Sequence, residues 1–189
     1  MNTRVFFISD THFGHNNICK FTTETGEKLR PWDNAFEMDE AMVELWNGVV
    51  REQDKVYHLG DVVMAKKHLS TLGKLNGKKV LIKGNHDIFK PNDYLEYFKD
   101  IRGYHVLAGM ILSHVPIHPA SLERFSVNLH GHLHSNRVML DGKFDPRYFS
   151  VCVEQIGFMP IQLEDLVERI KQQGGSTEMK PRFRDNCPS

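Results

Sequence analysis

The sequence has little cysteine, no surplus of either charge and no long hydrophobic run. Its 3 cysteines, Cys19, Cys152 and Cys187, lie far apart and form neither a CxxC pair nor a disulfide framework, which favours free thiols in a reducing compartment. The 24 basic and 24 acidic residues give a formal net charge of zero, so tight, sequence-independent binding to nucleic acid is not expected. The longest apolar runs are far shorter than a membrane span, which argues against a membrane partner.

The N-terminal stretch M-N-T-R-V-F-F-I-S-D also lacks the features of a signal peptide, because its apolar part is short and no small-residue cleavage site follows. We therefore predict a cytoplasmic protein. A chain of 189 residues that is 40% hydrophobic can bury one sizeable core. We expect one folded domain over residues 1–173 and a disordered tail over 174–189, which is polar and contains prolines.

The first half of the chain alternates strand-like and helix-like patterns. The strand-like segments are 4–8, 55–59 and 78–82, and the helix-like segments are 35–50, 66–74 and 93–99. In the second half, short strand-like segments cover 104–107, 109–113, 126–130, 136–140 and 148–154, and a helix with proline at its start covers 160–171. Asp141-Gly142 is a typical hairpin turn. This order predicts an α/β layered fold with one mixed sheet or two sheets.

Histidine is the abundant residue type that stands out, with 11 copies. Polar residues follow five of the apolar runs, in the blocks Asp10-Thr11-His12, Gly60-Asp61, Gly84-Asn85-His86-Asp87, Ser113-His114 and His130-Gly131-His132-Leu133-His134. Ligands of α/β sheets bind outside the carboxyl ends of the strands, so we expect these blocks to converge. A set of oxygen and nitrogen donors without cysteine suits Mn²⁺, Fe, Zn²⁺, Ni²⁺ or Mg²⁺.

The spacing within the blocks also indicates metal binding. Asp10 and His12 are two residues apart, so on an extended segment both point to one face, and His132 and His134 repeat this arrangement. The candidate ligands are too many for one ion and fit two ions that share a bridging carboxylate. Those candidates are Asp10, His12, Asp61, Asn85, His114, His132 and His134. Two such ions, about 3.5–4 Å apart, can activate water and hold a phosphate against it.

The blocks D-T-H, G-D, G-N-H-D, S-H and H-G-H-L-H, in this order between residues 10 and 134, resemble the calcineurin-like metallophosphoesterase superfamily. The resemblance implies a four-layer α/β sandwich, with two packed mixed β-sheets flanked by helices. It also implies that residues 1–173 form the catalytic domain and hold two divalent metal ions, with Mn²⁺ favoured.

The resemblance assigns a role to each block. It implies that Asp10, His12 and His134 bind the first metal, that Asn85, His114 and His132 bind the second, and that Asp61 bridges the two. His86 resembles the histidine that binds no metal and instead stabilises the phosphoryl group or protonates the leaving oxygen. Asp87 is expected to orient His86.

The segment after the second block, G-D-V-V-M-A-K-K, lacks the further Asp and Arg that protein phosphatases of this superfamily carry. The chain looks more like small bacterial and phage phosphoesterases. We therefore expect a metal-activated hydroxide to hydrolyse a small phosphodiester or phosphomonoester, with the diester favoured, such as a nucleotide, a cyclic nucleotide or a short oligonucleotide. The alternative is a scaffold of the same fold that engages a protein partner without catalysis. The sequence gives no signal for an oligomeric state.

Other histidines and one arginine near the blocks leave alternatives open. His15 and Arg30 are candidate substrate contacts, although a loop histidine and a surface ion pair would explain them as well. For His58 and His130, packing or a hydrogen bond to a ligand is favoured over direct metal binding. His118 either lines the pocket or forms a plain turn.

Overall fold

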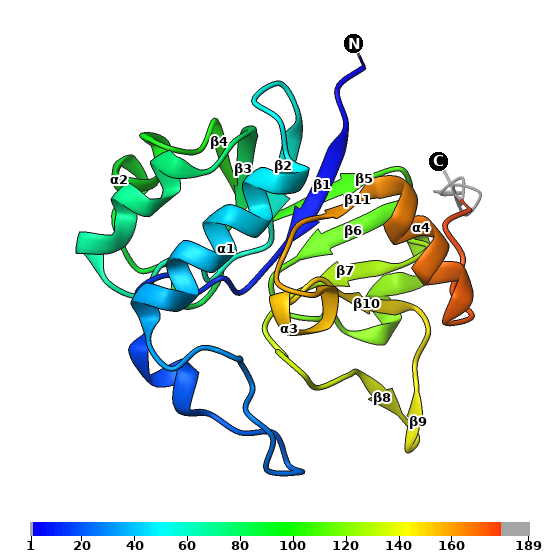
Figure 1. The fold of residues 1–189 in the computed structure, drawn as a ribbon. Coiled ribbons are helices and arrows are strands. Elements are labelled where there is room, and N and C mark those ends of the chain that lie inside the picture. Colours follow the sequence, from blue (N-terminus) through cyan, green and yellow to red (C-terminus); the bar gives the residue numbers. More distant parts are fainter. Residues whose placement is uncertain (1, 179–189) are drawn as a thin grey trace.

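The computed structural model describes residues 2–178 and contains two mixed β-sheets packed with helices, as predicted from the sequence (Figure 1). The first sheet has the order β11-β1-β2-β3-β4, with β1 (Val5–Ile8), β2 (Lys55–His58), β3 (Lys78–Ile82), β4 (Asp100–Arg102) and β11 (Ile161–Gln162). The second has the order β10-β7-β6-β5, with β5 (Tyr104–Leu107), β6 (Met110–Ser113), β7 (Asn128–His130) and β10 (Tyr148–Ser150). In each sheet one antiparallel strand, β11 or β5, lies at the edge of otherwise parallel pairs.

The strands that precede the polar blocks are buried on both faces. Phe6, Phe7 and Ile8 of β1 are at most 2% exposed, which is typical of parallel strands covered on both sides. Residues of both sheets, including Leu112 and Leu129 of the second, belong to one continuous hydrophobic core. Each such side chain contributes about 1.5–3 kcal/mol on burial.

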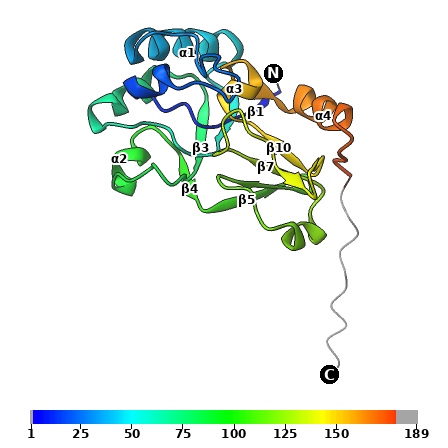
Figure 2. The same ribbon diagram turned by 90° about the horizontal axis from the view of Figure 1, so that it is seen from below.

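Helices cover the first sheet. These are α1 (Ala35–Val49), the 3-10 helix η2 (Lys66–Lys74) and α2 (Pro91–Leu95), and α4 (Leu163–Gln172) packs against β11 and β1 (Figures 1 and 2). The short elements η1 (Asn16–Lys20), η3 (Pro119–Arg124) and α3 (Val153–Ile156) connect the strands. Helix α1 begins after Asn34, whose side chain accepts the N–H of Glu37, and it buries Met38, Met42 and Trp46 at helical spacing.

The two sheets are joined where β1 ends. Ser9 and Cys152 form a parallel bridge, in which the Ser9 N–H donates to Val151 O at 2.8 Å and the Val153 N–H donates to Ser9 O at 3.1 Å. The last residues of β1 are therefore bonded to the chain that continues β10. This connection carries Asp10 of the first sheet to the strand ends of the second.

Two predicted elements were wrong in part. The strand expected over 148–154 ends at Ser150, and residues Val153–Ile156 form α3. The helix expected over 160–171 begins only at Leu163, because Ile161 and Gln162 pair antiparallel with β1. In the first case a short helix forms that ends at Gly157 in the left-handed conformation, and in the second case pairing with a distant strand overrides the local pattern.

Other expectations were confirmed, and one lies partly outside the described residues. Asp141 and Gly142 both have positive φ, 50° and 73°, in the turn between β8 (Met139–Leu140) and β9 (Lys143–Phe144). The tail predicted over 174–189 includes residues 179–189, which lie outside the described part of the chain. None of the helices within residues 2–178 has the length and apolar composition needed to cross a bilayer.

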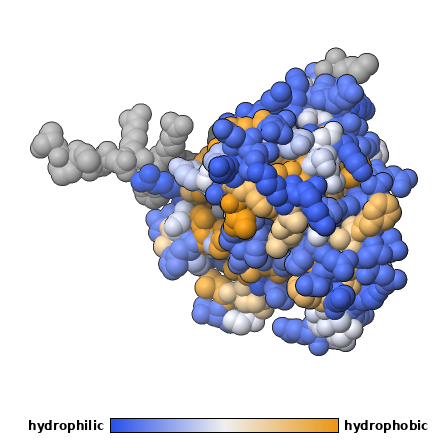
Figure 3. Space-filling view, turned by 90° about the vertical axis from the view of Figure 1, so that its left-hand side faces the viewer, coloured by the Kyte–Doolittle hydropathy of each residue, from blue (hydrophilic) through white to orange (hydrophobic). Residues whose placement is uncertain are grey.

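One face of the molecule is largely hydrophilic. Figure 3 shows one face on which hydrophobic residues gather in small patches between hydrophilic ones. Phe36 and Ile88, which are 76% and 75% exposed, are single apolar side chains of the kind that most protein surfaces carry. This face does not by itself indicate an interface between copies of the chain.

Candidate metal centre

The candidate ligands lie on tight turns after the strands. Asp10 and His12 have φ angles of 60° and 49°, so the segment after β1 is not extended, and the alternation expected for this pair is wrong. Asp61, His132 and His134 also have positive φ, at 56°, 71° and 50°. Such left-handed backbone costs about 1–2 kcal/mol for each non-glycine residue. Strain concentrated at five candidate ligands favours a functional site.

Asp10, His12 and His134 form the first candidate metal group, with ligand atoms within 4.8 Å of one another. Asp10 Oδ2 accepts the N–H of His132 at 2.9 Å, while Asp10 Oδ1 has no hydrogen-bond partner and lies 3.6 Å from His12 Nε2. Both ring nitrogens of His12 are buried without a partner. Unpaired buried polar atoms are costly, and a cation held between them would remove that cost. The first group therefore fits a metal ion.

Asp61, His114 and His132 form the second group. His114 Nδ1 donates to Leu59 O at 2.7 Å, which leaves the lone pair of Nε2 facing Asn85 Oδ1 at 2.8 Å and Asp61 Oδ2 at 3.4 Å. His132 Nδ1 lies 3.0 Å from the same Asn85 oxygen. Acceptor atoms that face each other at these distances need a proton or a cation between them. The donor set of the second group also fits a metal ion.

Asp61 lies between the two groups. Its Oδ2 is 3.7 Å from His12 Nε2 of the first group and 3.4 Å from His114 Nε2 of the second. Its Oδ1 accepts the N–H of His86 at 2.8 Å, which fixes the orientation of the carboxylate. Burial raises the pKa of Asp61, but the hydrogen bond and charge of His114 outweigh burial, so the pKa is lowered and the carboxylate is ionised at neutral pH.

Asp87 lies beneath the turn that carries Asp61. It is fully buried and accepts three backbone N–H groups, from Asp61 at 2.9 Å, Val62 at 3.0 Å and Gly84 at 2.8 Å. Burial raises the pKa of this carboxyl despite those bonds. The described hydrogen bonds of the two oxygens are with the Asp61 turn and with Gly84, and none is with the ring of His86.

Two glycines of the blocks are required by close contacts. A Cβ on Gly84 would lie 2.2 Å from Asp61 Oδ1, and a Cβ on Gly131 would lie 2.4 Å from Asp10 Oδ2. Neither position accepts a side chain unless a candidate ligand moves. Glycine in G-N-H-D and in G-H-L-H therefore lets two strand ends approach the carboxylates.

Arg30 lies behind the first group and has no exposed surface. Its guanidinium donates to Asp10 O at 2.6 Å, to Thr11 O at 2.8 Å and to Glu154 Oε1 at 2.8 and 2.9 Å. Arg30 was a candidate contact for a substrate phosphate, with a surface ion pair as the alternative, but every one of these acceptors belongs to the protein and the ion pair with Glu154 is buried. The guanidinium has no free surface for a substrate, and it holds the backbone that carries Asp10.

Glu154 was not identified from the sequence. Its side chain is 4% exposed, and Oε1 accepts from Arg30 and from His134 Nδ1, the latter at 3.0 Å. Burial raises its pKa, but the hydrogen bond of His134 and the charge of Arg30 outweigh burial and lower it. Since the bond occupies His134 Nδ1, it leaves Nε2 free to face the first group. The sequence signal that could have identified Glu154 is its position directly after the strand-like run V-C-V.

Two further histidines lie beside the ring of His12, and two others form hydrogen bonds elsewhere. His86 is exposed, and its ring lies 5.7 Å from that of His12, measured between centroids. The His15 ring lies equally close to His12, and burial with the neighbouring His12 lowers the pKa of His15 to about 4. His58 is buried and stacks on Trp46, as expected for packing, and it bonds to Thr11 Oγ1 at 3.0 Å and accepts the N–H of Gly60, neither of which is a candidate ligand. His118 caps η3 by accepting the N–H of Ala120, as in a turn.

Three comparisons place this chain among known proteins. A family model described as calcineurin-like phosphoesterase matches residues 3–169. The chain is 36% identical over 177 residues to an uncharacterized protein of Methanocaldococcus jannaschii, covering 89% of this chain and 92% of the relative. It is 30% identical over 189 residues to the Gene 66 protein of Mycobacterium phage D29, covering 80% and 88%. A crystal structure of a protein of unknown function from Aquifex aeolicus has a TM-score of 0.68 and 25% identity, covering 89% of this chain and 100% of the other.

Proposed function

The chain belongs to the calcineurin-like phosphoesterase family, and from this premise we propose that it is a binuclear metal-dependent hydrolase of small phosphate esters. The observation that carries the proposal is the position of Asp61 Oδ2, 3.7 Å from a nitrogen of one candidate metal group and 3.4 Å from a nitrogen of the other. A single carboxylate between two groups of imidazoles and carboxylates suits a pair of divalent ions.

In this proposal Asp10, His12 and His134 hold the first ion and Asn85, His114 and His132 hold the second, with Asp61 shared. The ions, when bound, supply the positive charge that neutralises a phosphate ester and lowers the pKa of water. The mixture of imidazole nitrogens with carboxylate and amide oxygens suits Mn²⁺, and Fe, Zn²⁺, Ni²⁺ and Mg²⁺ are the alternatives.

His86 is the proposed catalytic residue that binds no metal. Its backbone N–H is fixed on Asp61 Oδ1, while its side chain is exposed beside the first group. A histidine at this position can donate a proton to the leaving alkoxide near neutral pH. We assign Asp87 a positioning role, since it binds the backbone of the Asp61 turn from below. Substitution of His86 by alanine is expected to leave metal binding intact and to reduce kcat.

The proposed substrate is a small phosphodiester rather than a phosphoprotein. The chain lacks the Asp and Arg that follow the G-D block in protein phosphatases, and it is similar to a phage protein of comparable length. Cyclic nucleotides, short oligonucleotides and other nucleotides are the proposed substrates of this kind. His15, whose ring lies beside that of His12, is the remaining candidate substrate contact. We also propose a cytoplasmic location, which the two described cysteines support because both are free, buried thiols.

Hydrolysis of an aryl phosphodiester and of the matching monoester, with Mn²⁺ added, tests this function. We expect diester turnover that is absent in Asp61→Ala. Turnover of the monoester alone would contradict the diester preference. If neither ester is hydrolysed while both ions are bound, the chain is instead a scaffold of this fold that engages a protein partner.

A further inference from the structure

A cavity lies beside His130, the first residue of the H-G-H-L-H segment. Its volume is about 330 Å³, and its lining comes from β7, β10, the β8–β9 hairpin, α3 and α4. None of the candidate metal ligands lines it. This volume is at the lower end of the range for sites that bind small organic molecules.

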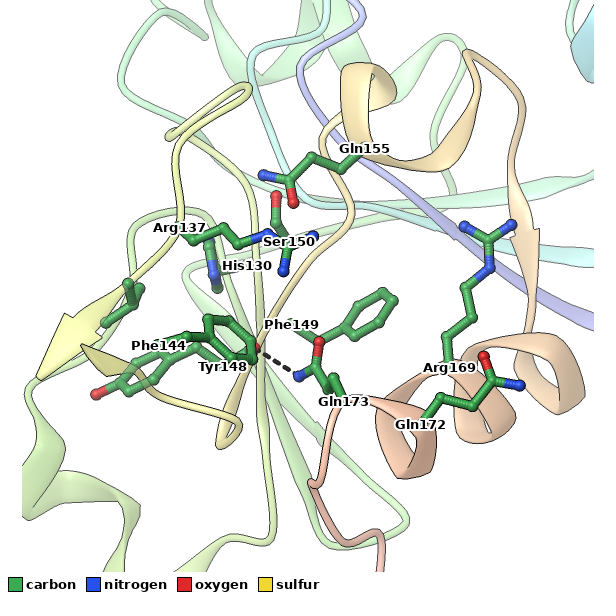
Figure 4. Close-up of a pocket in the computed structure, with 11 residues that line it drawn as sticks. His130, Arg137, Phe144, Tyr148, Phe149, Ser150, Gln155, Arg169, Gln172 and Gln173 are labelled. Atoms are coloured by element: carbon green, nitrogen blue, oxygen red, sulfur yellow. Dashed lines mark hydrogen bonds between the residues drawn. The ribbon is translucent and has the colours of Figure 1, made fainter.

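Two arginines without a partner line this cavity. Within residues 2–178, neither Arg137 nor Arg169 forms an ion pair or a side-chain hydrogen bond, and Arg137 only stacks over the Phe144 ring at 5.2 Å. The described lining contains no carboxylate. Figure 4 shows Arg137 toward one end of the pocket and Arg169 with Gln172 toward the other. The guanidiniums make both ends of the cavity positively charged, and a guanidinium can bind a phosphate group through paired hydrogen bonds.

A buried histidine nitrogen also opens on the cavity. His130 is 1% exposed, and its Nδ1 bonds to the carbonyl oxygen of Gly131 at 2.8 Å. Since the carbonyl can only accept, Nδ1 carries the hydrogen and Nε2 is an acceptor. No described residue donates to Nε2. A ligand that carries a hydroxyl group would supply the missing donor, and Ser150 lies at the same end of the pocket (Figure 4).

We propose that this cavity is a second binding site, for a small hydroxyl-bearing phosphate monoester such as a sugar phosphate or a nucleoside monophosphate. Arg169 binds the phosphate at one end of the cavity, and His130 Nε2 accepts a hydrogen bond from a sugar hydroxyl at the other end, beside Arg137. The glutamines of the lining hold the walls in place. Gln173 Nε2 donates to Pro146 O and Tyr148 O, and Gln155 Nε2 donates to His134 O at 2.7 Å. Since no metal ligand lines the cavity, binding there needs no metal ion.

The test is calorimetric titration of the full chain with ribose 5-phosphate and with AMP, both with Mn²⁺ and after removal of metal by a chelator. The Arg137→Gln/Arg169→Gln double variant removes both charges and keeps the side chains polar. Arg51→Gln, at an exposed arginine outside the cavity, is the matched control. We expect binding in the metal-free wild type and in the control, and binding at least about tenfold weaker in the double variant. The two ligands show whether the site takes a free sugar phosphate or a nucleotide.

Two results would overturn the proposal. One is equal affinity of the wild type and the double variant for both ligands. The other is binding only in the presence of Mn²⁺, which would place the phosphate at the metal centre. Ester hydrolysis by the double variant is measured separately, and we expect it to be unchanged. Failure of this second site therefore remains distinguishable from failure of the proposed hydrolase activity.

Discussion

The buried contact between Arg30, Glu154 and His134 gives a prediction about one metal ion of the pair. Substitution Glu154→Gln keeps the size of the side chain and removes its charge. Glu154 Oε1 accepts from His134 Nδ1 at 3.0 Å and from Arg30 at 2.8 Å, and Arg30 in turn holds the carbonyl of Asp10. The change therefore affects two ligands of the first group and none of the second.

The magnitude follows from the burial of these groups. Loss of a hydrogen-bonding partner behind a metal-binding histidine costs about 10–100-fold in metal affinity. Glu154→Ala also leaves the fully buried Arg30 without its carboxylate, which costs about 3–5 kcal/mol of folding stability. We expect the first ion to bind about 10–100-fold more weakly in Glu154→Gln, with the second ion unaffected.

The assay is calorimetric titration of the metal-free chain with Mn²⁺, fitted to two sites, together with the melting temperature of each variant. Glu164→Gln is the matched control, because Glu164 is exposed and bonds only to the side chain of Gln162. Equal affinities of both ions in the wild type and in Glu154→Gln would refute the reasoning. A uniform loss at both ions would indicate general damage to the fold rather than a positioning role.

Further predictions concern catalysis, a glycine, acid stability and metal removal. His86→Ala is expected to bind both ions and to lose about 10²–10⁴-fold in kcat, and full activity with normal metal content would exclude the assigned role. Gly131→Ala places a Cβ 2.1 Å from Ser9 Oγ, so we expect a lower melting temperature and weaker Mn²⁺ binding than in Gly103→Ala, where nothing lies within 4 Å. Burial raises the pKa of Asp54, but the hydrogen bonds of Arg4 and Arg51 outweigh burial, so the pKa is lowered in the folded state. The ionised carboxylate therefore stabilises the fold at pH values above its unfolded pKa, and this stabilisation is lost as the pH falls. Asp54→Asn should therefore lose less stability than the wild type between about pH 5 and 3, as measured by urea unfolding, and parallel losses would contradict the assignment. With each of the two ions at about 100 times its Kd, chelation should lower the melting temperature by roughly 10–20 °C, and scanning calorimetry that finds no shift would argue against ions bound to the folded state.

Much of the fold could be predicted, because hydrophobic patterning in this chain agrees with the elements that form. The parallel strands β1, β2 and β3 are buried on both faces and so form continuous apolar runs, and α1 has helical spacing with an Asn cap. The short strand β11 was missed, since its existence depends on pairing with β1 far away in the sequence. The end of the predicted 148–154 strand forms α3, a short helix that ends at the left-handed Gly157.

The candidate metal ligands could be predicted from the sequence, but the residues that hold them in place could not. Asp10, His12, Asp61 and the histidine pair are marked by their position after apolar runs. Glu154 also follows an apolar run, V-C-V, but its role depends on a helix that the sequence pattern did not show. Whether Arg30 faces a substrate or the protein interior depends on burial, which the local pattern L-R-P-W-D does not encode.

The central claim is that two ions share Asp61, and the most direct test is electron paramagnetic resonance of the Mn²⁺-loaded chain combined with metal content. Two ions bridged by one carboxylate are expected to give two Mn²⁺ per chain and a spin-coupled spectrum, and Asp61→Ala is expected to lose the coupling. A single bound ion, or two ions with uncoupled spectra in the wild type, would contradict the account.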